Sequence, residues 1–333
     1  MGEINKKIII LVMGTNEKTD PFFRQEYEEC CKKTWIKNLP SNFRVIYYQG
    51  GEKTELKDDI LTVACEDDLK NTYKKTYFAL DYIDKNFDYD IIFRTNTSTY
   101  INGYLLNLFI NNIYEEDYFY GSEIYSLSEA YCPYPLFLYR RGNGIIYNKN
   151  EVKNILIEGI NLLYLGHTDD IALDNVLNSI NIKHYLKIGE KYLDNHRGIP
   201  HAWYKSVDNK FDSRHALSSY NKSKYYWMCP TVTIKRYRKR DEEFDIYKEF
   251  HGIIENIEYP DEKEIIEKMK SYSLDFSIFV GSILGYFNYS KWKTFDKNRL
   301  YLLEISSKAT DDEQFNIRKE IQGKFNNFDL NRL

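Results

Sequence analysis

The chain has 333 residues, of which 43% are hydrophobic, so it can bury at least one sizeable core and is not a disordered chain. Its formal net charge of −4 argues against nucleic-acid binding as a property of the whole surface. Five cysteines, an odd count, make a poor disulfide framework and favour a cytoplasmic location, and no apolar run is long enough to span a membrane.

Apolar runs bounded by turn residues alternate with helical periods along the first half of the chain. We expect strands at 7–14, 43–49, 60–65, 90–94 and 118–122, and helices at 21–38, 68–87, 102–113, 150–165, 168–178 and 261–270. This alternation predicts an α/β sheet with mostly parallel strands. Ligands of such sheets bind at the carboxyl ends of the strands, where Gly14-Thr15 and the segment 94–98 are expected.

The second half of the chain is less regular. Residues 132–148 are rich in turn formers, and beyond Pro260 the sequence becomes charged and then amphipathic. We therefore predict a domain over residues 1–258 and a helical C-terminal appendage over 259–333. The apolar run 276–287 fits either a helix buried against the domain or a helix lying on a membrane surface.

An acidic pair stands at the start of the helix expected from Thr168. Thr168 is a natural N-cap, and Asp169 and Asp170 fall in the first turn, where carboxylates complement the helix dipole. The same position keeps a carboxylate ionised, as a general base requires. Both the structural and the catalytic interpretation stay open on these residues alone.

Several short blocks between residues 7 and 255 occur in the order found in one known family. They are Lys32-Lys33-Thr34-Trp35, Asn71 to Lys75 with Thr76, the run DIIFRTNTSTYIN from Asp90 to Asn102, Pro133-Tyr134-Pro135, Gly142-Asn143-Gly144, Thr168-Asp169-Asp170-Ile171 and Phe250-His251. In this order they resemble the Fringe-like β-1,3-glycosyltransferases, an inverting GT-A family.

The resemblance implies a GT-A fold, which is a Rossmann-like, mixed and mostly parallel sheet flanked by helices. It further implies transfer of a hexose or N-acetylhexosamine from a UDP-sugar to a carbohydrate hydroxyl, with inversion of the anomeric centre. The partners are then the nucleotide sugar and a glycan acceptor, and a lipid-linked acceptor brings the enzyme to the cytoplasmic face of a membrane. Such a transfer needs one base to take the acceptor proton; by the resemblance this base is Asp170, with Asp169 as the fallback.

The clearest departure from the family lies in its metal loop, where Asn96, Thr97 and Ser98 replace carboxylates. A divalent cation neutralises a leaving diphosphate, and neutral oxygens hold Mn²⁺ or Mg²⁺ more weakly than carboxylates do. Three interpretations follow. The enzyme works without metal and uses Lys or Arg on the diphosphate; it binds metal weakly through Asn96, Ser98 and His251; or it has lost catalysis. We favour the first, and His251 also fits a structural histidine.

By the same resemblance, the donor side comprises Thr15, Asn16, Asn71, Lys75, Arg94, Asn96, Thr97 and Ser98. A strand-end turn and a surface pair on a helix are the alternative explanations for the first four. Candidate cations for the diphosphate are Arg94, Arg140, Arg141 and the basic run 235–240. That run also fits a solvated basic face or a contact with an anionic membrane.

The acceptor side is expected around Gly142, Asn143, Gly144, His167 and Trp203. Glycines let a sugar approach the backbone closely, and an aromatic face stacks on a sugar ring. An ordinary turn and core packing are the alternative explanations for these residues.

Two other functions fit the same fold class. The missing metal carboxylates suit a non-catalytic protein that binds a glycan or a partner chain. A retaining GT-A transferase is the second alternative, because a fold does not determine stereochemistry.

Overall fold

The structure, a computed structural model of the chain, describes residues 6–16, 24–68, 70–122, 124–126, 138–140, 142–162, 169–170, 172–174, 176–177, 196–205, 210–212, 233–236, 251–252, 261–267 and 269–270. Its strands are β1 Ile8–Met13, β2 Phe43–Gly51, β3 Glu55–Lys57, β4 Ile60–Ala64, β5 Ile91–Asn96, β6 Thr99–Ile101, β7 Phe119–Gly121, β8 Ile124–Ser126, β9 Leu138–Arg140, β10 Ile145–Asn148, β11 His196–Gly198, β12 His201–Lys205, β13 Lys210–Asp212 and β14 Thr233–Arg236. Its helices are α1 Arg24–Lys33, α2 Thr72–Asn86, α3 Gly103–Asn112 and α4 Lys149–Glu158, with short 3-10 helices η1 Trp35–Asn38 and η2 Gly159–Leu162. The described residues among 169–177 are also helical and are called the 169–177 helix below.

Within the described residues, the main sheet has eight strands in the order β11-β7-β10-β5-β1-β2-β4-β3. β1 pairs in parallel with both β2 and β5, and β2 pairs in parallel with β4. β10 instead runs antiparallel to β5 and β7. This arrangement confirms the predicted fold class, a mixed and mostly parallel sheet flanked by helices. Because the strand order reverses at β1, ligand binding is expected at the carboxyl ends of β1 and β5.

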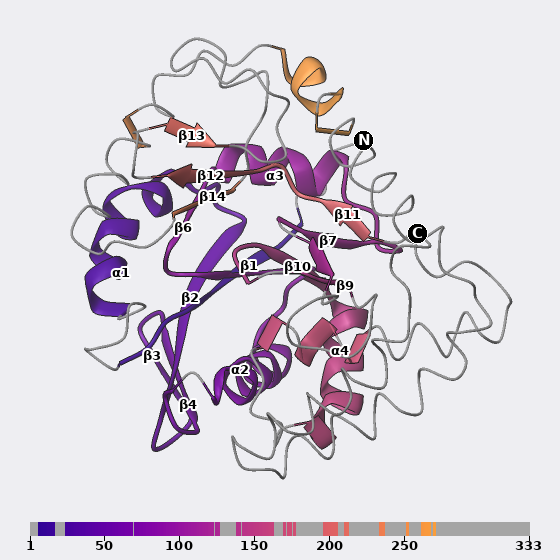
Figure 1. The fold of residues 1–333 in the computed structure, drawn as a ribbon. Helices are drawn as coiled ribbons and strands as arrows, with labels where there is room; N and C mark the ends of the chain where they lie inside the picture. Colours follow the sequence, from indigo (N-terminus) through magenta and orange to yellow (C-terminus); the bar gives the residue numbers. More distant parts are fainter. Residues whose placement is uncertain are drawn as a thin grey trace, which may run out of the picture.

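Helices cover both faces of this sheet, with α1 and α3 on one side and α2 and α4 on the other (Figure 1). Side chains alternate along β1. Ile8, Ile10 and Val12 join the core beneath α1 and α3, and the residues between them join the core beneath α2 and α4. The 169–177 helix adds Ala172 and Leu173 to this second core. It therefore packs on the α2 and α4 side of the sheet.

The predicted strands and helices of the first half are confirmed, with boundaries that move by a few residues. The strand predicted at 90–94 extends to Asn96, and the helix predicted at 68–87 begins at Thr72. The prediction of turns over 132–148 was incomplete, because this segment also contains β9 and β10. The four residues of β10 are all buried, and so short a run shows no period in the sequence.

A second sheet, counted within the described residues, has four strands in the order β13-β12-β14-β6. The chain crosses from the main sheet to this one through Thr97 and Ser98, between β5 and β6. β14 pairs antiparallel with β6, so Lys235 lies opposite Thr99. β12 pairs with β14, so Trp203 lies opposite Lys235. The backbones of Trp203, Lys235 and Thr99 therefore form one row across three strands.

The beginning of the predicted appendage packs against the domain. Residues 261–270 are helical from residue 262 wherever they are described, as predicted, and Ile265 and Met269 are buried in the core beneath α1 and α3. The predicted boundary near residue 258 and the run 276–287 lie outside the described residues. None of the helices described here combines the length and the apolar character needed to cross a membrane.

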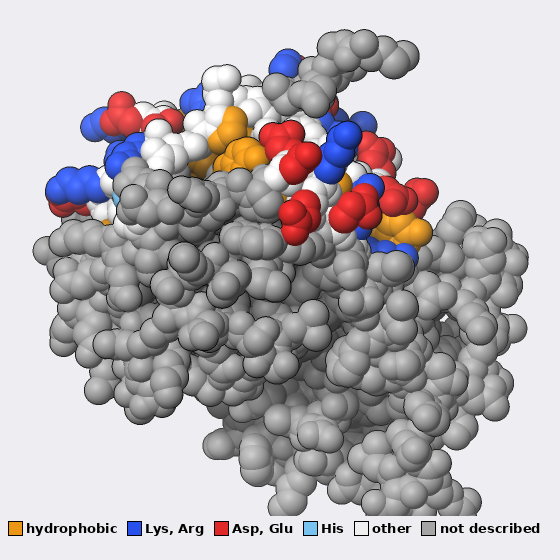
Figure 2. All heavy atoms as spheres, turned by 90° about the horizontal axis from the view of Figure 1, so that it is seen from above, with side chains coloured by type: hydrophobic (Ala, Val, Ile, Leu, Met, Phe, Trp, Pro, Cys, Tyr) orange, Lys and Arg blue, Asp and Glu red, His pale blue; other side chains and the backbone are white. Residues whose placement is uncertain are grey.

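Charged side chains of both signs are interspersed on the described surface seen in Figure 2. Exposed ion pairs are formed one turn apart on helices, such as Lys33 with Glu29 on α1 and Lys85 with Asp81 on α2. Exposed pairs of this kind contribute little to stability, because water and salt screen them and ordering the side chains costs entropy. The ion pairs that organise the candidate site lie inside the protein.

Candidate functional site

Polar residues gather where β5 leaves the main sheet. Asn96, Thr97 and Thr99 are buried and Ser98 is partly buried. The oxygens Asn96 Oδ1, Ser98 Oγ and Thr99 Oγ1 have no hydrogen-bond partner among the residues that the structure describes. Leaving a buried polar atom unpaired costs about 1–3 kcal/mol, so such atoms are nearly always satisfied. Residues 96–99, called the 96–99 segment below, are therefore where a polar ligand or water is expected to complete the hydrogen bonds.

Arg94 lies two residues before Asn96 and is fully buried in β5. Its Nη2 forms an ion pair with Asp169 and lies 3.2 Å from Met13 Sδ at the end of β1. Its Nη1 donates a hydrogen bond to the carbonyl oxygen of Gly142. The structure thus brings together three residues that the sequence assigned to different roles: Arg94 on the donor side, Asp169 as the fallback base and Gly142 on the acceptor side.

The Asp169 carboxylate is also bonded from α2. Thr76 Oγ1 donates to Asp169 Oδ2 at 2.9 Å, and the hydroxyls of Thr76 and Tyr48 lie 2.7 Å apart. Burial raises the pKa of Asp169, the charge of Arg94 opposes this rise, and the charge of Asp170 adds to it. Asp170 is partly exposed, whereas Asp169 is buried. Of the acidic pair, Asp170 is therefore the more exposed residue.

A second buried arginine binds the same helix about one turn further along. Arg140, the last residue of β9, pairs with Asp174 at 2.8 Å and with Glu151 at 3.1 Å. Its Nη1 also donates to the carbonyl oxygen of Ile146 at 2.8 Å. Burial raises the pKa of Glu151 to about 7, although the charge of Arg140 opposes the rise. One guanidinium therefore faces two buried carboxylates.

The predicted donor residues Thr15 and Asn16, just after β1, and Lys75, on α2, meet at Asp67, which was not predicted from the sequence. Asp67 Oδ1 accepts hydrogen bonds from Lys75 Nζ at 2.8 Å and from the Gly50 backbone at 2.9 Å. Asp67 Oδ2 accepts from Thr15 Oγ1 at 3.1 Å and from the Asn16 backbone. Burial acts to raise the pKa of Asp67, but the charge of Lys75 and these hydrogen bonds outweigh it, and the pKa is lowered. Thr15, Asn16 and Lys75 thus lie together.

The position of Asp67 offered one signal in the sequence. It lies shortly after β4, at the carboxyl end of a parallel strand, where α/β sheets bind ligands. Asn71, another predicted donor residue, is buried at the start of α2. Its backbone N–H and its Nδ2 both donate to Asp68 Oδ1, at 2.8 and 2.7 Å. Asn71 thereby binds the start of α2 to the segment that precedes it.

The glycines predicted for the acceptor side are packed against other parts of the protein. A Cβ atom on Gly142 would overlap the Arg94 guanidinium, and one on Gly144 would overlap the Ser122 hydroxyl. These two positions therefore require glycine for a close approach between protein atoms. Contact with an acceptor stays a prediction for Gly142, Asn143 and Gly144. His167 lies outside the described residues.

His251 is buried against the residue that follows the 96–99 segment. Its Nδ1 is 3.0 Å from the hydroxyl of Tyr100, which directly follows Thr99. The metal donors available there are amide, hydroxyl and imidazole groups, whereas Mn²⁺ and Mg²⁺ prefer carboxylate oxygens. Within the described part of the chain, no three His, Cys, Asp or Glu side chains gather where they could hold a metal ion. The described residues therefore do not fit a resident Mn²⁺ or Mg²⁺.

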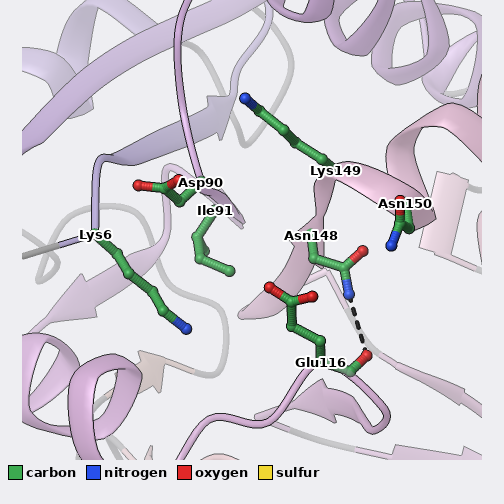
Figure 3. Close-up of a pocket in the computed structure, with 7 residues that line it drawn as sticks. All are labelled: Lys6, Asp90, Ile91, Glu116, Asn148, Lys149 and Asn150. Carbon is green, nitrogen blue, oxygen red and sulfur yellow. Dashed lines mark hydrogen bonds between the residues drawn. The ribbon is translucent and has the colours of Figure 1, made fainter. Parts of the chain in front are cut away.

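A hollow of about 290 Å³ lies at the opposite ends of the main-sheet strands (Figure 3). Its lining has mixed charge and comprises Lys6, Asp90, Ile91, Glu116, Asn148, Lys149 and Asn150. Lys6 precedes β1 and Asp90 precedes β5, so the hollow lies at the amino ends of these strands. The predicted site residues do not line it.

Comparisons with known proteins were made by sequence and by shape. No protein-family model and no curated protein sequence matches the chain. The glycosyltransferase GlyE of Streptococcus pneumoniae TIGR4 is similar in shape, with 11% identity and a TM-score of 0.36, over 81% of this chain and 64% of GlyE. The mannosyltransferase PcManGT of Pyrobaculum calidifontis, solved in complex with GDP-Man and Mn²⁺, has 10% identity and a TM-score of 0.36, over 98% of this chain and 88% of its own. The chain thus spans less than two thirds of the length of GlyE.

Proposed function

We propose that the protein is a glycosyltransferase that moves a sugar from a nucleotide-sugar donor to a hydroxyl of a glycan acceptor. The observation that carries this proposal is the ion pair between Arg94 and Asp169, which joins the acidic pair to the strand that leads into the 96–99 segment. The predicted base is therefore linked to the predicted donor segment at the carboxyl ends of the strands, where α/β proteins bind ligands. The Fringe-like resemblance supports the finer proposal of a UDP-sugar donor carrying a hexose or N-acetylhexosamine.

Asp170 is the proposed general base. Its carboxylate takes the proton of the acceptor hydroxyl as that oxygen attacks the anomeric carbon, and the bond from this carbon to the diphosphate breaks, so the configuration inverts. Asp169 is buried and already accepts hydrogen bonds from Arg94 and Thr76. The greater exposure of Asp170 supports its assignment over Asp169.

We infer a donor site that works without a resident metal ion, because the donor atoms near the 96–99 segment are neutral. The hydroxyls of Ser98 and Thr99 can donate hydrogen bonds to diphosphate oxygens. Arg94 and Arg140 are both buried in ion pairs, which leaves them poorly placed to neutralise a diphosphate. We therefore assign that charge to the basic run beginning at Lys235, whose backbone lies opposite Thr99.

On the acceptor side, we propose Trp203 as a stacking surface, because β12 sets it one strand beyond Lys235 in the same row. Asn143 and His167 remain proposed acceptor contacts. We propose that the reaction takes place in the cytoplasm, and at the cytoplasmic face of a membrane if the acceptor is lipid-linked.

A non-catalytic binding protein is the second candidate function. It is favoured by the neutral residues Asn96 to Ser98, since a binding protein does not need to stabilise a leaving diphosphate. Such a protein binds the nucleotide sugar or the glycan and releases no nucleotide. A retaining transferase differs from the proposed enzyme only in stereochemistry, which the anomeric proton of the product reports by NMR.

The test is a panel of UDP- and GDP-sugars in which both donor binding and nucleotide release are measured, with Mn²⁺ and with EDTA. We expect one donor to release nucleotide in both conditions, and Asp170→Asn to abolish release while donor binding is kept. Asp81→Asn, at a surface position on α2, is the control. Binding without release supports the second candidate. Neither binding nor release from any donor overturns both, and loss of release in EDTA overturns the metal-free site.

A further inference from the structure

The guanidinium of Arg94 joins four segments of the proposed site. It belongs to β5, pairs with Asp169 of the 169–177 helix, lies 3.2 Å from Met13 Sδ at the end of β1, and donates to the carbonyl oxygen of Gly142. The side chain is fully buried. Because an isolated buried cation is very costly, the position of Arg94 and the position of Asp169 depend on each other.

Asp169 is held by more than this ion pair. Thr76 Oγ1 donates to its Oδ2 at 2.9 Å, and the backbone N–H of Asp170 also donates to its carboxylate. Asp169 therefore has little freedom to move. Since Asp170 is the next residue along the helix, any displacement of Asp169 is passed to the proposed base.

The loop opposite Arg94 is shaped to admit the guanidinium. A Cβ atom on Gly142 would overlap it, so only glycine leaves the space. Thr95, the neighbour of Arg94, donates to the carbonyl oxygen of Asn143 at 3.1 Å. The same two residues of β5 thus bind both the 142–144 loop and the 169–177 helix.

The geometry points to Arg94 as a positioning residue, whose ion pair with Asp169 sets the Asp170 carboxylate relative to the 96–99 segment. This inference rests on the proposed function. In this role Arg94 acts through Asp169 rather than directly on a substrate. The reacting atoms must approach within about 3–3.5 Å, and a misplacement of about 1 Å can cost about 10²-fold in rate. The rate of transfer is therefore expected to depend on this contact more than donor binding does.

Arg140 supplies a matched control. It is also fully buried, and it pairs with Asp174 on the same helix at 2.8 Å. Asp174 lies one turn beyond Asp170, and Arg140 lies at the end of β9 rather than next to the 96–99 segment. A purely structural role for both arginines predicts equal effects on transfer when each is replaced.

The experiment compares Arg94→Lys with Arg140→Lys in the full chain. Each change keeps the positive charge but loses the planar fork that pairs with a carboxylate. We measure kcat, the donor KM and Tm, and assay each variant well below its Tm. We expect Arg94→Lys to lower kcat about 10- to 100-fold while the donor KM stays within about threefold. For Arg140→Lys we expect a similar fall in Tm and a kcat within about threefold of the original chain.

A milder pair of variants keeps the test decisive if Arg94→Lys does not fold. Thr76→Val removes one hydrogen bond to Asp169 and leaves every charge in place. Its control is Thr34→Val, which removes a buried hydroxyl bonded to the Cys30 carbonyl oxygen at 2.7 Å. We expect a fall in kcat of about threefold or more for Thr76→Val and none for Thr34→Val.

Two outcomes overturn the inference while leaving the proposed function intact. In the first, the original chain transfers sugar, but the variants of each pair lose kcat equally for an equal fall in Tm. In the second, Arg94→Lys raises the donor KM about tenfold with kcat unchanged, which makes Arg94 a donor contact. An original chain that turns over no donor is a distinct result, since it overturns the proposed function and this inference with it.

Discussion

Arg94 and Arg140 are both buried and both bind the 169–177 helix, but their surroundings differ. Arg140 meets two carboxylates, and its guanidinium lies 4.9 Å from the ring centre of Tyr147 and 5.1 Å from that of Phe119. Arg94 pairs with one buried carboxylate, donates a hydrogen bond to a carbonyl oxygen and lies close to a sulfur atom.

This difference teaches that burial of an ion pair does not by itself reveal its role. Replacing a buried ion pair with packed apolar side chains is often neutral or stabilising, so neither arginine is explained by stability alone. The residues around each arginine distinguish the two roles. Around Arg140, the partners are other residues of the scaffold. Arg94 instead lies two residues before a segment in which Asn96 Oδ1, Ser98 Oγ and Thr99 Oγ1 lack partners among the described residues.

The largest expected effect concerns Asp170, which follows the Asp169 that Arg94 binds. Asp170→Asn removes the proposed base and should lower kcat about 10²- to 10⁴-fold, because proton removal in the transition state is lost. Donor affinity should stay unchanged, since the proposed role of Asp170 is on the acceptor. Steady-state transfer and donor calorimetry check this. Unchanged transfer in Asp170→Asn would reject Asp170 as the base. The part of the helix that Arg94 binds would then have no functional distinction from the part that Arg140 binds.

The next largest effect tests Arg140 as part of the scaffold. Arg140→Met leaves Asp174 and Glu151 buried without their cation and should lower the free energy of unfolding by about 3–5 kcal/mol. Lys85→Met is the control, because its ion pair with Asp81 lies at the surface and its loss should lower the free energy of unfolding far less. Urea unfolding measures both. A loss below about 1 kcal/mol would mean that the two carboxylates tolerate the loss of their cation.

The third prediction concerns the space that Gly142 leaves for the Arg94 guanidinium. Gly142→Ala sets a Cβ atom against the guanidinium and should destabilise the protein by about 1–3 kcal/mol through overpacking. The control is Gly252→Ala, at a helical residue where a Cβ meets nothing within 4 Å and where alanine should stabilise by about 0.4–1 kcal/mol. Thermal unfolding compares the two variants. Equal Tm values would show that the 142–144 loop moves away from Arg94 at little cost.

The smallest effect is a pH dependence of stability that arises from Glu151, a partner of Arg140. The pKa of Glu151 is raised to about 7, so the folded state binds this proton more tightly than the unfolded state does. The stability from this group is therefore fully present below its ordinary pKa and is lost as pH rises toward about 7, at no more than about 1.4 kcal/mol per pH unit.

Glu151→Gln isolates this pH dependence. As pH rises from about 5 to 7.5, the original chain should become less stable relative to Glu151→Gln, because glutamine cannot lose a proton. Urea unfolding at several pH values gives the difference, and Glu158→Gln at the exposed end of α4 controls for the loss of a carboxylate. A difference that does not change with pH would contradict the raised pKa.

Local elements could be predicted from the sequence because their signals are local. The run at 8–13 indicated a strand, and the structure distributes its side chains alternately between two cores. The family resemblance assigned both Thr15 and Lys75 to the donor side, but their shared partner Asp67 was not identified. β10 was missed because four buried residues show no period.

The contacts that build the site could not be predicted, because they join distant parts of the chain. Arg94 within an apolar run was a usable signal, since a cation in a buried strand requires a carboxylate partner. The chain has 50 acidic residues, however, and nothing local to Arg94 selects Asp169 among them. The order of blocks in the family resemblance identified the acidic pair, whereas only the structure revealed that Arg94 and Asp169 neutralise each other.

The long sequence separations in the site bear on how the protein forms. β1, β2, β4 and β5 are complete by residue 96, whereas the contact of Thr76 with Asp169 closes 93 residues and that of Tyr100 with His251 closes 151. Loop closure must come before such contacts can contribute, so they are expected to form late. During synthesis, these four strands are therefore finished well before Asp170 leaves the ribosome. The parallel centre of the sheet is therefore made before the proposed base, and a prematurely ended chain can carry these four strands without it.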